Sequence, residues 1–468
     1  MSDKIGILPL ARPTFDVPYA EEQFAAMQEQ LDRVVLSGQP AELVGGEALL
    51  FDAEQTESAI QRLKGEGIDQ LLVLQLTFTD AAMLVRASEQ IDKPLSIWAI
   101  PEPRLGGRLR LNSFCGLNLA SHALSLNNTR FSYLYQSPTE TGSGALAELL
   151  GGKRVTRPIP VESSAGLESD AGRDVVAALQ GKRIARIGEH PDGFATCVYS
   201  ARDAKQLTGI TIDELALDEL FGMASKADTD RTAEVARQAE AGLSGLQLVD
   251  QEQLNRSYKL KVALDDIRQQ GSYDAFAIRC WPETFTEYGG AVCGPVSMLG
   301  ETRVPCACEA DVYGAMTQLM LQSIANAPVF LVDLVDLDAS DNSGVVWHCG
   351  QAPLSMADTS VEPTATIHTN RKMPLLYQFP LKPGRVTFAR LSQANGDPKL
   401  IISAGEMLKR DMAFTGTSGV IRFDRDADTI LSRVMDSGVE HHMGLVYGDY
   451  VDQLKSVAAS LNLPIVEL

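Results

Sequence analysis

The sequence predicts an α/β protein in which two doubly wound parallel domains are followed by a β-rich, barrel-like C-terminal domain. Apolar runs of strand length alternate with amphipathic stretches over the first and middle parts of the chain, which is typical of parallel sheets. A segment rich in Pro, Ser and Gly, from Gln136 to about Gly172, separates these two blocks. Beyond Ala357, short β-rich runs bounded by Gly, Pro, Asn and Asp indicate an antiparallel barrel or sandwich.

The length of the chain also requires several domains. At 468 residues it exceeds what one hydrophobic core usually organises, and its 45% hydrophobic content can supply several cores. We therefore expect an N-terminal α/β domain, a central α/β domain and a C-terminal β-rich domain, with the bounds 1–165, 166–350 and 351–468.

Strands and helices alternate in both α/β blocks. In the first block the expected strands are Lys4–Leu8, Gln70–Leu74 and Leu95–Ala99, and the expected helices are Tyr19–Leu36, Ala53–Gly65 and Ala81–Gln90. In the second block the expected strands are Arg183–Ile187 and Ala275–Arg279, and the expected helices are Asp228–Ala241 and Gln251–Gln270. Neither block has a dinucleotide fingerprint or a P-loop, which excludes those nucleotide chemistries.

The stretch from Val304 to Pro353 holds most of the chemically informative residues. Its pattern predicts, in order, a strand, a helix and two further strands: Val304–Cys308, Ala310–Ala325, Val329–Leu334 and Gly344–His348. Glu309 lies where the first strand enters the helix, Asp333 lies near the end of the second strand, and His348 closes the third. Because ligands collect at the carboxyl ends of strands in open α/β sheets, these three side chains are expected to meet around one ion.

Each of these residues also has an ordinary structural explanation. Glu309 alone suits a helix N-terminus, and a lone His348 suits a hydrogen-bonded core position. Asp333 lies in the apolar run VFLVDLVD, where a buried carboxylate needs a partner or a metal ion to offset its desolvation. The three together predict a metal site.

Two adjacent histidines follow in the C-terminal part. In extended chain His441 and His442 point to opposite faces, so only one of them is expected to serve a given ion. The alternative is an exposed histidine pair beside an acid.

The net charge limits the kinds of binding partner, and the cysteine content indicates the cellular compartment. There are 41 basic and 61 acidic residues, a net charge of -20, with no Lys/Arg-rich block, so nucleic acid and anionic membranes are disfavoured as partners. No apolar run has the length of a membrane span or of a secretory signal. The 7 cysteines form no paired CxxC pattern, which fits the reducing cytoplasm.

Five segments taken together resemble a known family. RCWPE, CGPVSMLGETRVPCACEADVYGA, VFLVDLVD, WHCGQAP and EHHMGLVYGD occur in this order between residues 279 and 449. In order and spacing they are similar to the L-fucose isomerase and L-arabinose isomerase superfamily of metal-dependent aldose-ketose isomerases. The resemblance implies two Rossmann-like domains and a C-terminal β-rich domain.

The resemblance also implies a site. Glu309 and Asp333 match the acidic metal ligands and proton-transfer groups, and His442 of the histidine pair completes the metal shell. His348 matches the second histidine of arabinose isomerases, whereas the acid at 333 is Asp, as in fucose isomerases. The residues expected beside the substrate are Arg12, Trp281, Glu283, Trp347 and His441. A homo-oligomer, trimer or hexamer, is implied, with the active site near a subunit interface and Arg12 projecting into a neighbour's site.

Aldose-ketose isomerisation explains these residue types. A proton moves between carbons 2 and 1 through an enediol-type species, so carboxylates serve as acid and base while a divalent ion stabilises the developing charge. Mn²⁺ suits mixed carboxylate and imidazole ligands. The monosaccharide is expected to be a pentose, a 6-deoxyhexose or an anionic hexose such as a sulfonated one, the last met by Arg104, Arg108 and Arg110.

Two other classes of protein remain open at this point. A non-catalytic sugar-binding protein shares the layout of two α/β domains, and metal content distinguishes it from an isomerase. A thiol-dependent hydrolase would use Cys349 beside His348, or Cys293 at a helix start. Adjacent residues on a strand face opposite ways, which disfavours the first of these pairs.

Overall fold

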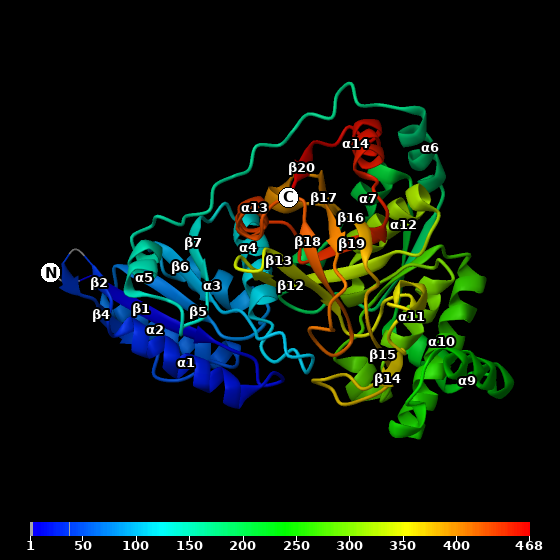
Figure 1. Cartoon of the computed structure of the whole chain (residues 1–468), viewed down its shortest axis with the longest axis horizontal. Helices are drawn as coiled ribbons and strands as arrows, with labels where there is room; N and C mark the ends of the chain where they lie inside the picture. The colour runs from blue at the N-terminus through cyan, green and yellow to red at the C-terminus, as the bar shows by residue number, and fades with distance from the viewer. Residues whose placement is uncertain (1–2, 37) are drawn as a thin grey trace.

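The computed structural model describes residues 3–36 and 38–468 and has three parts, each built on its own β-sheet (Figure 1). The N-terminal part lies at one end of the molecule, the barrel lies in the middle, and the central α/β part lies beside the barrel at the other end. Among the described residues, no helix has both the length and the apolar character needed to cross a membrane.

The N-terminal sheet is parallel, with the order β4-β1-β5-β6-β7. Its strands are β1 (Lys4–Leu10), β4 (Glu42–Gly45), β5 (Gln70–Gln75), β6 (Leu95–Ala99) and β7 (Phe131–Tyr135). The helices are α1 (Val17–Leu31), α2 (Ala53–Glu66), α3 (Ala82–Gln90), α4 (Ser113–Leu126) and α5 (Ser143–Leu150); a short hairpin of β2 (Val35–Leu36) and β3 (Gln39–Pro40) follows α1. Leu71 and Val73 pack toward α2 and α3 while Leu72 and Leu74 pack toward α1, so both faces of the sheet are covered as predicted.

Helix α4 was not predicted by the sequence. Twelve of its residues, Ser113 to Leu124, are buried, so it has no polar face and no amphipathic period. It is buried all round because it packs on the N-terminal sheet and also against β12 of the barrel.

The central sheet is also parallel, with the order β11-β10-β8-β9. Its strands are β8 (Arg183–Ile187), β9 (Thr211–Leu215), β10 (Ala275–Ile278) and β11 (Cys306–Ala307). The helices are α6 (Asp170–Leu179), α7 (Ala201–Thr208), α8 (Leu217–Ser225), α9 (Thr229–Gly242), α10 (Gln251–Gly271), α11 (Cys293–Glu301) and α12 (Val312–Ala325). The predicted connection between the two α/β parts contains α5 and then runs across the top of the barrel to α6 in Figure 1, where the backbone of Glu162 pairs with Ile465.

The C-terminal sheet closes into a barrel of six antiparallel strands, because β18 pairs with both β13 and β17 in the ring β18-β13-β12-β19-β16-β17. β15 and β20 add parallel strands outside this ring, and β14 pairs with β15. The elements are β12 (Phe330–Asp338), β13 (Ser343–His348), β14 (Thr364–Thr366), β15 (Leu376–Pro380), β16 (Gly384–Ser392), β17 (Lys399–Met407), β18 (Thr417–Phe423), α13 (Ala427–Ser437), β19 (His442–Tyr447), α14 (Val451–Ser460) and β20 (Ile465–Glu467).

The strands that carry Asp333 and His348 belong to the barrel and not to the parallel sheet that the sequence suggested. Only residues 339–342 join β12 to β13, and a connection this short permits an antiparallel hairpin but no parallel crossover. The change from parallel sheet to barrel therefore falls between α12 and β12. The domain bounds after residues 165 and 350 stay predictions.

Helix α12 connects the two chemically important regions. It starts just after β11 and packs against β10 on one side and against β16 and β19 of the barrel on the other. Ala315, Met316 and Leu319 are fully or almost fully buried between these sheets. The helix thus holds the turn after β11 against the barrel wall that presents Asp333 and His442.

Candidate active site

Glu309 lies in a strained turn at the carboxyl end of β11. The turn Cys308–Ala310 places Glu309 at φ 58° and Ala310 at φ 55°, in the left-handed region that non-glycine residues seldom occupy. Such strain persists only where the surroundings enforce it, and it concentrates at functional sites. Asp311, the N-cap of α12, follows at once and accepts a hydrogen bond from the Gly314 amide at 2.8 Å, which fixes the end of the turn.

Both oxygens of the Glu309 carboxylate are held by neighbours. Trp281 Nε1 donates to Oε1 at 2.9 Å, and His441 Nε2 lies 3.0 Å from Oε2. Burial alone would raise the pKa of Glu309, but the hydrogen bond and charge of His441 hold that pKa below its ordinary value. Burial likewise opposes protonation of His441, but Glu309 raises the pKa of the imidazole above its usual range. These contacts therefore favour the ionised form of the buried Glu309 carboxylate.

Asp333 reaches the same place from the barrel. Leu331 packs with the α12 side of β12 and Val332 with the opposite core, so the alternation of the strand puts Asp333 on the α12 side. Asp333 is 7% exposed, and among residues 3–36 and 38–468 its Oδ1 finds no hydrogen-bond partner. A buried carboxylate oxygen without a partner fits a position beside a cation.

His442 lies between the two acids. It pairs with Asp333 across the β12–β19 ladder, and its Nε2 is 3.5 Å from Asp333 Oδ1 and 3.8 Å from Glu309 Oε2. Burial lowers the pKa of His442, and the nearby His441 lowers it further. A neutral ring whose Nδ1 donates to Asp311 Oδ2 at 3.0 Å has its Nε2 lone pair free toward both acids.

Asp311 and Arg390 form a buried support behind His442 that the sequence did not reveal. Each side chain is 1% exposed, and Arg390 donates to both Asp311 oxygens at 2.5 and 3.0 Å. Burial would raise the pKa of Asp311, but the Arg390 charge and His442 hold it far below its usual range. The available signal for Asp311 was its helix-capping position, which is common in proteins and gives no hint of a partner on β16.

The two adjacent histidines do not point to opposite faces. His441 lies in a bend before β19, so the alternation expected of extended chain starts only at His442. The ring centroids are 3.8 Å apart, and the Nε2 atoms of both rings lie within 3.8 Å of Glu309 Oε2.

His348 has an asymmetric environment. The backbone amide of Cys349 donates to its Nδ1 at 2.9 Å, which makes Nδ1 the acceptor and puts the hydrogen of a neutral ring on Nε2. Within the described part of the chain, Nε2 is buried and has no partner. Cys349 Sγ lies 3.4 Å from His348 Nδ1, because β13 ends at His348 and strand alternation does not apply beyond it.

Most of the residues predicted from the sequence line one small cavity of about 100 Å³. Those on its wall are Glu309, Asp333, His348, His441, Arg12, Trp281 and Trp347. His442 is not on this wall, but its Nε2 lies 3.5 Å from Asp333 Oδ1. Glu283 does not line the cavity, since Arg279 binds both its oxygens at 2.6 and 2.7 Å. Arg12 faces the cavity of its own chain, 5.4 Å from the ring centroid of Trp281.

The three arginines expected to meet an anion have other partners. Arg104 is ion-paired to Asp336 at 2.6 Å, and Arg110 is ion-paired to Asp16 at 2.8 Å. Arg108 donates to the Asn370 side chain at 2.7 Å. None of the three belongs to the cavity wall.

The donor set fits a divalent metal ion. Glu309, His441 and His442 offer ligand atoms within 4.8 Å of one another, and so do Asp333, His348 and His442. Two carboxylates, one of which has an unpartnered oxygen, and an imidazole with a free lone pair are donors that such ions take in proteins. The fold and this centre define an α/β protein in which a buried donor set suited to a metal ion adjoins a small cavity.

Comparisons with known proteins identify the family. Residues 6–152 match the N-terminal domain of the fucose/sulfoquinovose isomerase family, and residues 346–468 match the L-fucose isomerase C-terminal domain. A sulfoquinovose isomerase of Priestia aryabhattai is 31% identical over 458 residues, 97% of each chain. Enzymes of the same name from Alkalicoccus urumqiensis and Clostridium sp. (strain MSTE9) are 29% identical over 98% of each chain. A solute-binding protein from Agrobacterium vitis with bound allitol covers 69% of the chain at a TM-score of 0.25, which is too low for any conclusion.

The chain belongs to the fucose/sulfoquinovose isomerase family, as the sequence motifs indicated. It is a sugar isomerase that interconverts an aldose and its ketose, and the family is metal-dependent. Full-length similarity to isomerases favours this class over the sugar-binding protein and over the thiol hydrolase.

Proposed function

We propose that the chain isomerises a sulfonated hexose in its open-chain form, with Glu309, Asp333 and His442 as metal ligands and Mn²⁺ as the ion. The convergence of these three side chains, with Asp333 Oδ1 left unpartnered in a buried position, carries the proposal. The substrate class is supported by the relatives named sulfoquinovose isomerase that align with 97–98% of this chain. Mn²⁺ is supported by the mixed oxygen and nitrogen donors.

The two carboxylates divide the proton transfer. Glu309 enters the cavity from the turn after β11 and Asp333 enters from the barrel, so they approach a sugar from different elements. One carboxylate takes the proton from carbon 2 of the aldose and delivers it to carbon 1, while the other relays the hydroxyl proton from oxygen 2 to oxygen 1, with the enediol-type species between the two steps. A bound divalent ion would stabilise the negative charge that develops on the two neighbouring sugar oxygens.

His441 and Trp281 keep Glu309 in the charge state that a base requires. Their hydrogen bonds to the two carboxylate oxygens favour the ionised form, and each lies within 3.0 Å. Trp281 and Trp347 also give the cavity aromatic surfaces against which the apolar face of a sugar packs.

We propose a donor role for His348, in place of the ligand role that the sequence resemblance implies. The Cys349 amide occupies Nδ1, so a neutral His348 presents Nε2–H toward the cavity. A hydrogen-bond donor there suits a sugar oxygen, whereas a metal ligand would need a lone pair at that atom.

Assembly and compartment also belong to the proposal. A homo-oligomer, trimer or hexamer, with the site near an interface, is supported by the sequence resemblance to the fucose and arabinose isomerases. The cytoplasm is supported by the composition of the chain, with 7 cysteines in no paired pattern. Sedimentation analysis of the purified protein measures the assembly state.

The test combines metal analysis with turnover. The purified protein is analysed for metals, treated with a chelator, reloaded with Mn²⁺, and incubated with sulfoquinovose and a panel of neutral aldoses in D₂O under NMR. We expect about one metal ion per chain and metal-dependent deuterium exchange at carbons 1 and 2 of the sulfonated sugar. A protein that binds no metal and exchanges no proton in any sugar would contradict the proposal.

A further inference from the structure

Two arginines face the same cavity as the acids, in a chain with a net charge of -20. The guanidinium carbon of Arg12 lies 5.4 Å from the ring centroid of Trp281, and that of Arg371 lies 5.7 Å from it. The Nε1 of the same indole donates to Glu309. The indole of Trp281 therefore contacts Glu309 at its Nε1 and lies near both arginines at its ring.

The two arginines differ in how their charges are balanced. Arg12 donates to Asp80 Oδ2 at 2.5 Å, which makes a half-buried ion pair. Over residues 3–36 and 38–468, no ion pair or hydrogen bond of the Arg371 guanidinium is found. Burial lowers the pKa of Arg371, and the nearby Arg12 lowers it further, so the site disfavours a second cation unless an anion joins it. Arg12, Asp80 and Arg371 together have one uncompensated positive charge.

The loop that carries Arg371 is fixed by contacts that do not involve the Arg371 guanidinium. His368 Nδ1 accepts the amides of Asn370 and Arg371, both at 3.2 Å. Arg108, from the loop before α4, donates to Asn370 Oδ1 at 2.7 Å. Arg108 is thus occupied by Asn370 and holds in place the residue that precedes Arg371. A guanidinium on a fixed loop can bind an oxyanion with little loss of conformational entropy.

We propose that Arg371 is the residue that recognises the anionic group of the substrate, at the end of the sugar remote from carbons 1 and 2, with Arg12 adding to the positive field. This inference rests on the proposed function, because it requires the reacting carbons to lie beside Glu309 and Asp333. A guanidinium binds sulfonate and phosphate oxygens alike. The single uncompensated charge favours the monoanionic sulfonate over the dianionic phosphate ester.

The test compares three hexoses that differ only at carbon 6: sulfoquinovose, glucose 6-phosphate and 6-deoxyglucose. For Arg371→Gln we expect kcat/KM on sulfoquinovose to fall roughly 10- to 100-fold, which is the effect of losing a hydrogen bond to a charged group. Most of this loss should come from a higher KM, with little change in kcat. Activity on 6-deoxyglucose should stay within about 2-fold, since no anion is present to be lost. Arg371→Lys should recover part of the affinity because the charge remains. Arg130→Gln, which changes an exposed arginine that is not on the cavity wall, is the matched control.

A binding measurement separates recognition from catalysis. Calorimetric titration of sulfoquinovose into the metal-loaded wild type should show weaker binding as salt rises, and Arg371→Gln should lose most of that salt dependence. Equal losses on sulfoquinovose and 6-deoxyglucose would overturn the role of Arg371 while leaving the isomerase intact. Preference of the wild type for glucose 6-phosphate would overturn the assignment to a monoanion. A wild type that isomerises none of the three would contradict the proposed function instead.

Discussion

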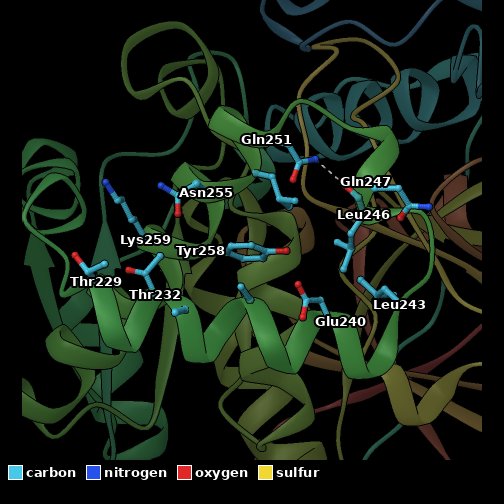
Figure 2. Close-up of a pocket in the computed structure, with 13 residues that line it drawn as sticks. Thr229, Thr232, Glu240, Leu243, Leu246, Gln247, Gln251, Asn255, Tyr258 and Lys259 are labelled. Atoms are coloured by element: carbon cyan, nitrogen blue, oxygen red, sulfur yellow. Dashed lines mark hydrogen bonds between the residues drawn. The ribbon is translucent and has the colours of Figure 1, made fainter.

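Two of the cavities in the described part of the molecule contrast in size and in chemistry. The larger one, about 660 Å³, lies between α9 and α10, with Tyr258 pointing from α10 toward α9 (Figure 2). Its wall contains no histidine or cysteine and a single acid, Glu240. The smaller one, about 100 Å³, is bounded by Glu309, Asp333, His348 and His441.

The comparison of the two cavities shows that the candidate active site is identified by its buried charged groups and not by the volume of its cavity. Groups on the α9–α10 groove meet water and satisfy one another locally, as Gln251 does with the Leu246 carbonyl at 2.9 Å (Figure 2). In the small cavity, three elements distant in sequence bring charged groups together where few water molecules can solvate them. Buried charges of this kind are retained at functional sites because they are costly elsewhere.

The largest effect is expected from replacing Glu309, the proposed base in the small cavity. Glu309→Gln should lower kcat by about 10²- to 10⁴-fold, because an amide of the same shape cannot accept the carbon-bound proton. Turnover of sulfoquinovose and metal content are measured together. Glu283→Gln is the matched control, since Glu283 is held by Arg279 outside the cavity and its change should leave turnover within about 10-fold. Near wild-type turnover by Glu309→Gln with metal bound would exclude Glu309 as the base.

Variants of Asp311 test whether metal binding depends on the buried Asp311–Arg390 pair behind His442. Asp311→Asn should weaken Mn²⁺ binding about 10- to 100-fold, because Asp311 orients His442 through Nδ1. Competition with a chelating dye gives the affinity, and thermal melting of the metal-free form reports the separate cost of leaving Arg390 unpaired. Asp311→Glu, which keeps the charge, guards against a variant that fails to fold. Unchanged metal affinity in both variants would restrict Asp311 to a purely structural role.

Variants of His348 distinguish a metal ligand from a hydrogen-bond donor to the sugar. His348→Asn retains an N–H donor, and His348→Leu removes it. If Nε2–H donates to the sugar, the leucine variant should lose about 10-fold in kcat/KM while metal affinity stays the same. Elemental analysis measures the bound metal, and steady-state kinetics measures kcat/KM. A loss of metal in the leucine variant would instead make His348 a ligand, as the resemblance to arabinose isomerases implies.

The smallest effect is expected at the large groove. Asn255 is exposed on its wall, so Asn255→Ala should leave kcat/KM unchanged and alter the free energy of unfolding by no more than about 0.5 kcal/mol. Urea unfolding and standard kinetics are sufficient measurements. A clear drop in turnover would mean that the groove communicates with the small cavity.

Much of the fold was predictable because burial leaves a local period in the sequence. The parallel strands at Gln70–Gln75 and Leu95–Ala99 are buried throughout and mostly apolar, as expected of strands covered on both faces, and the predicted bounds differ from the observed ones by at most one residue. Helix α1 was predicted to continue to Leu36 but ends at Leu31, where the β2–β3 hairpin begins to form. Helix α4 left no period to find, because two different parts of the protein cover it.

The sequence by itself determined the kinds of chemistry present: Glu309 at a strand–helix junction, Asp333 inside an apolar strand and a histidine pair near the C-terminus. Tertiary structure decided how they meet. It placed Asp333 in a closed barrel, turned His441 beside His442, locked Asp311 to Arg390 and left the Arg371 guanidinium facing the cavity. Local patterns report whether a side chain is buried, but its partner comes from an element tens to hundreds of residues away. That pairing is fixed only when the sheets close and the helices pack between them.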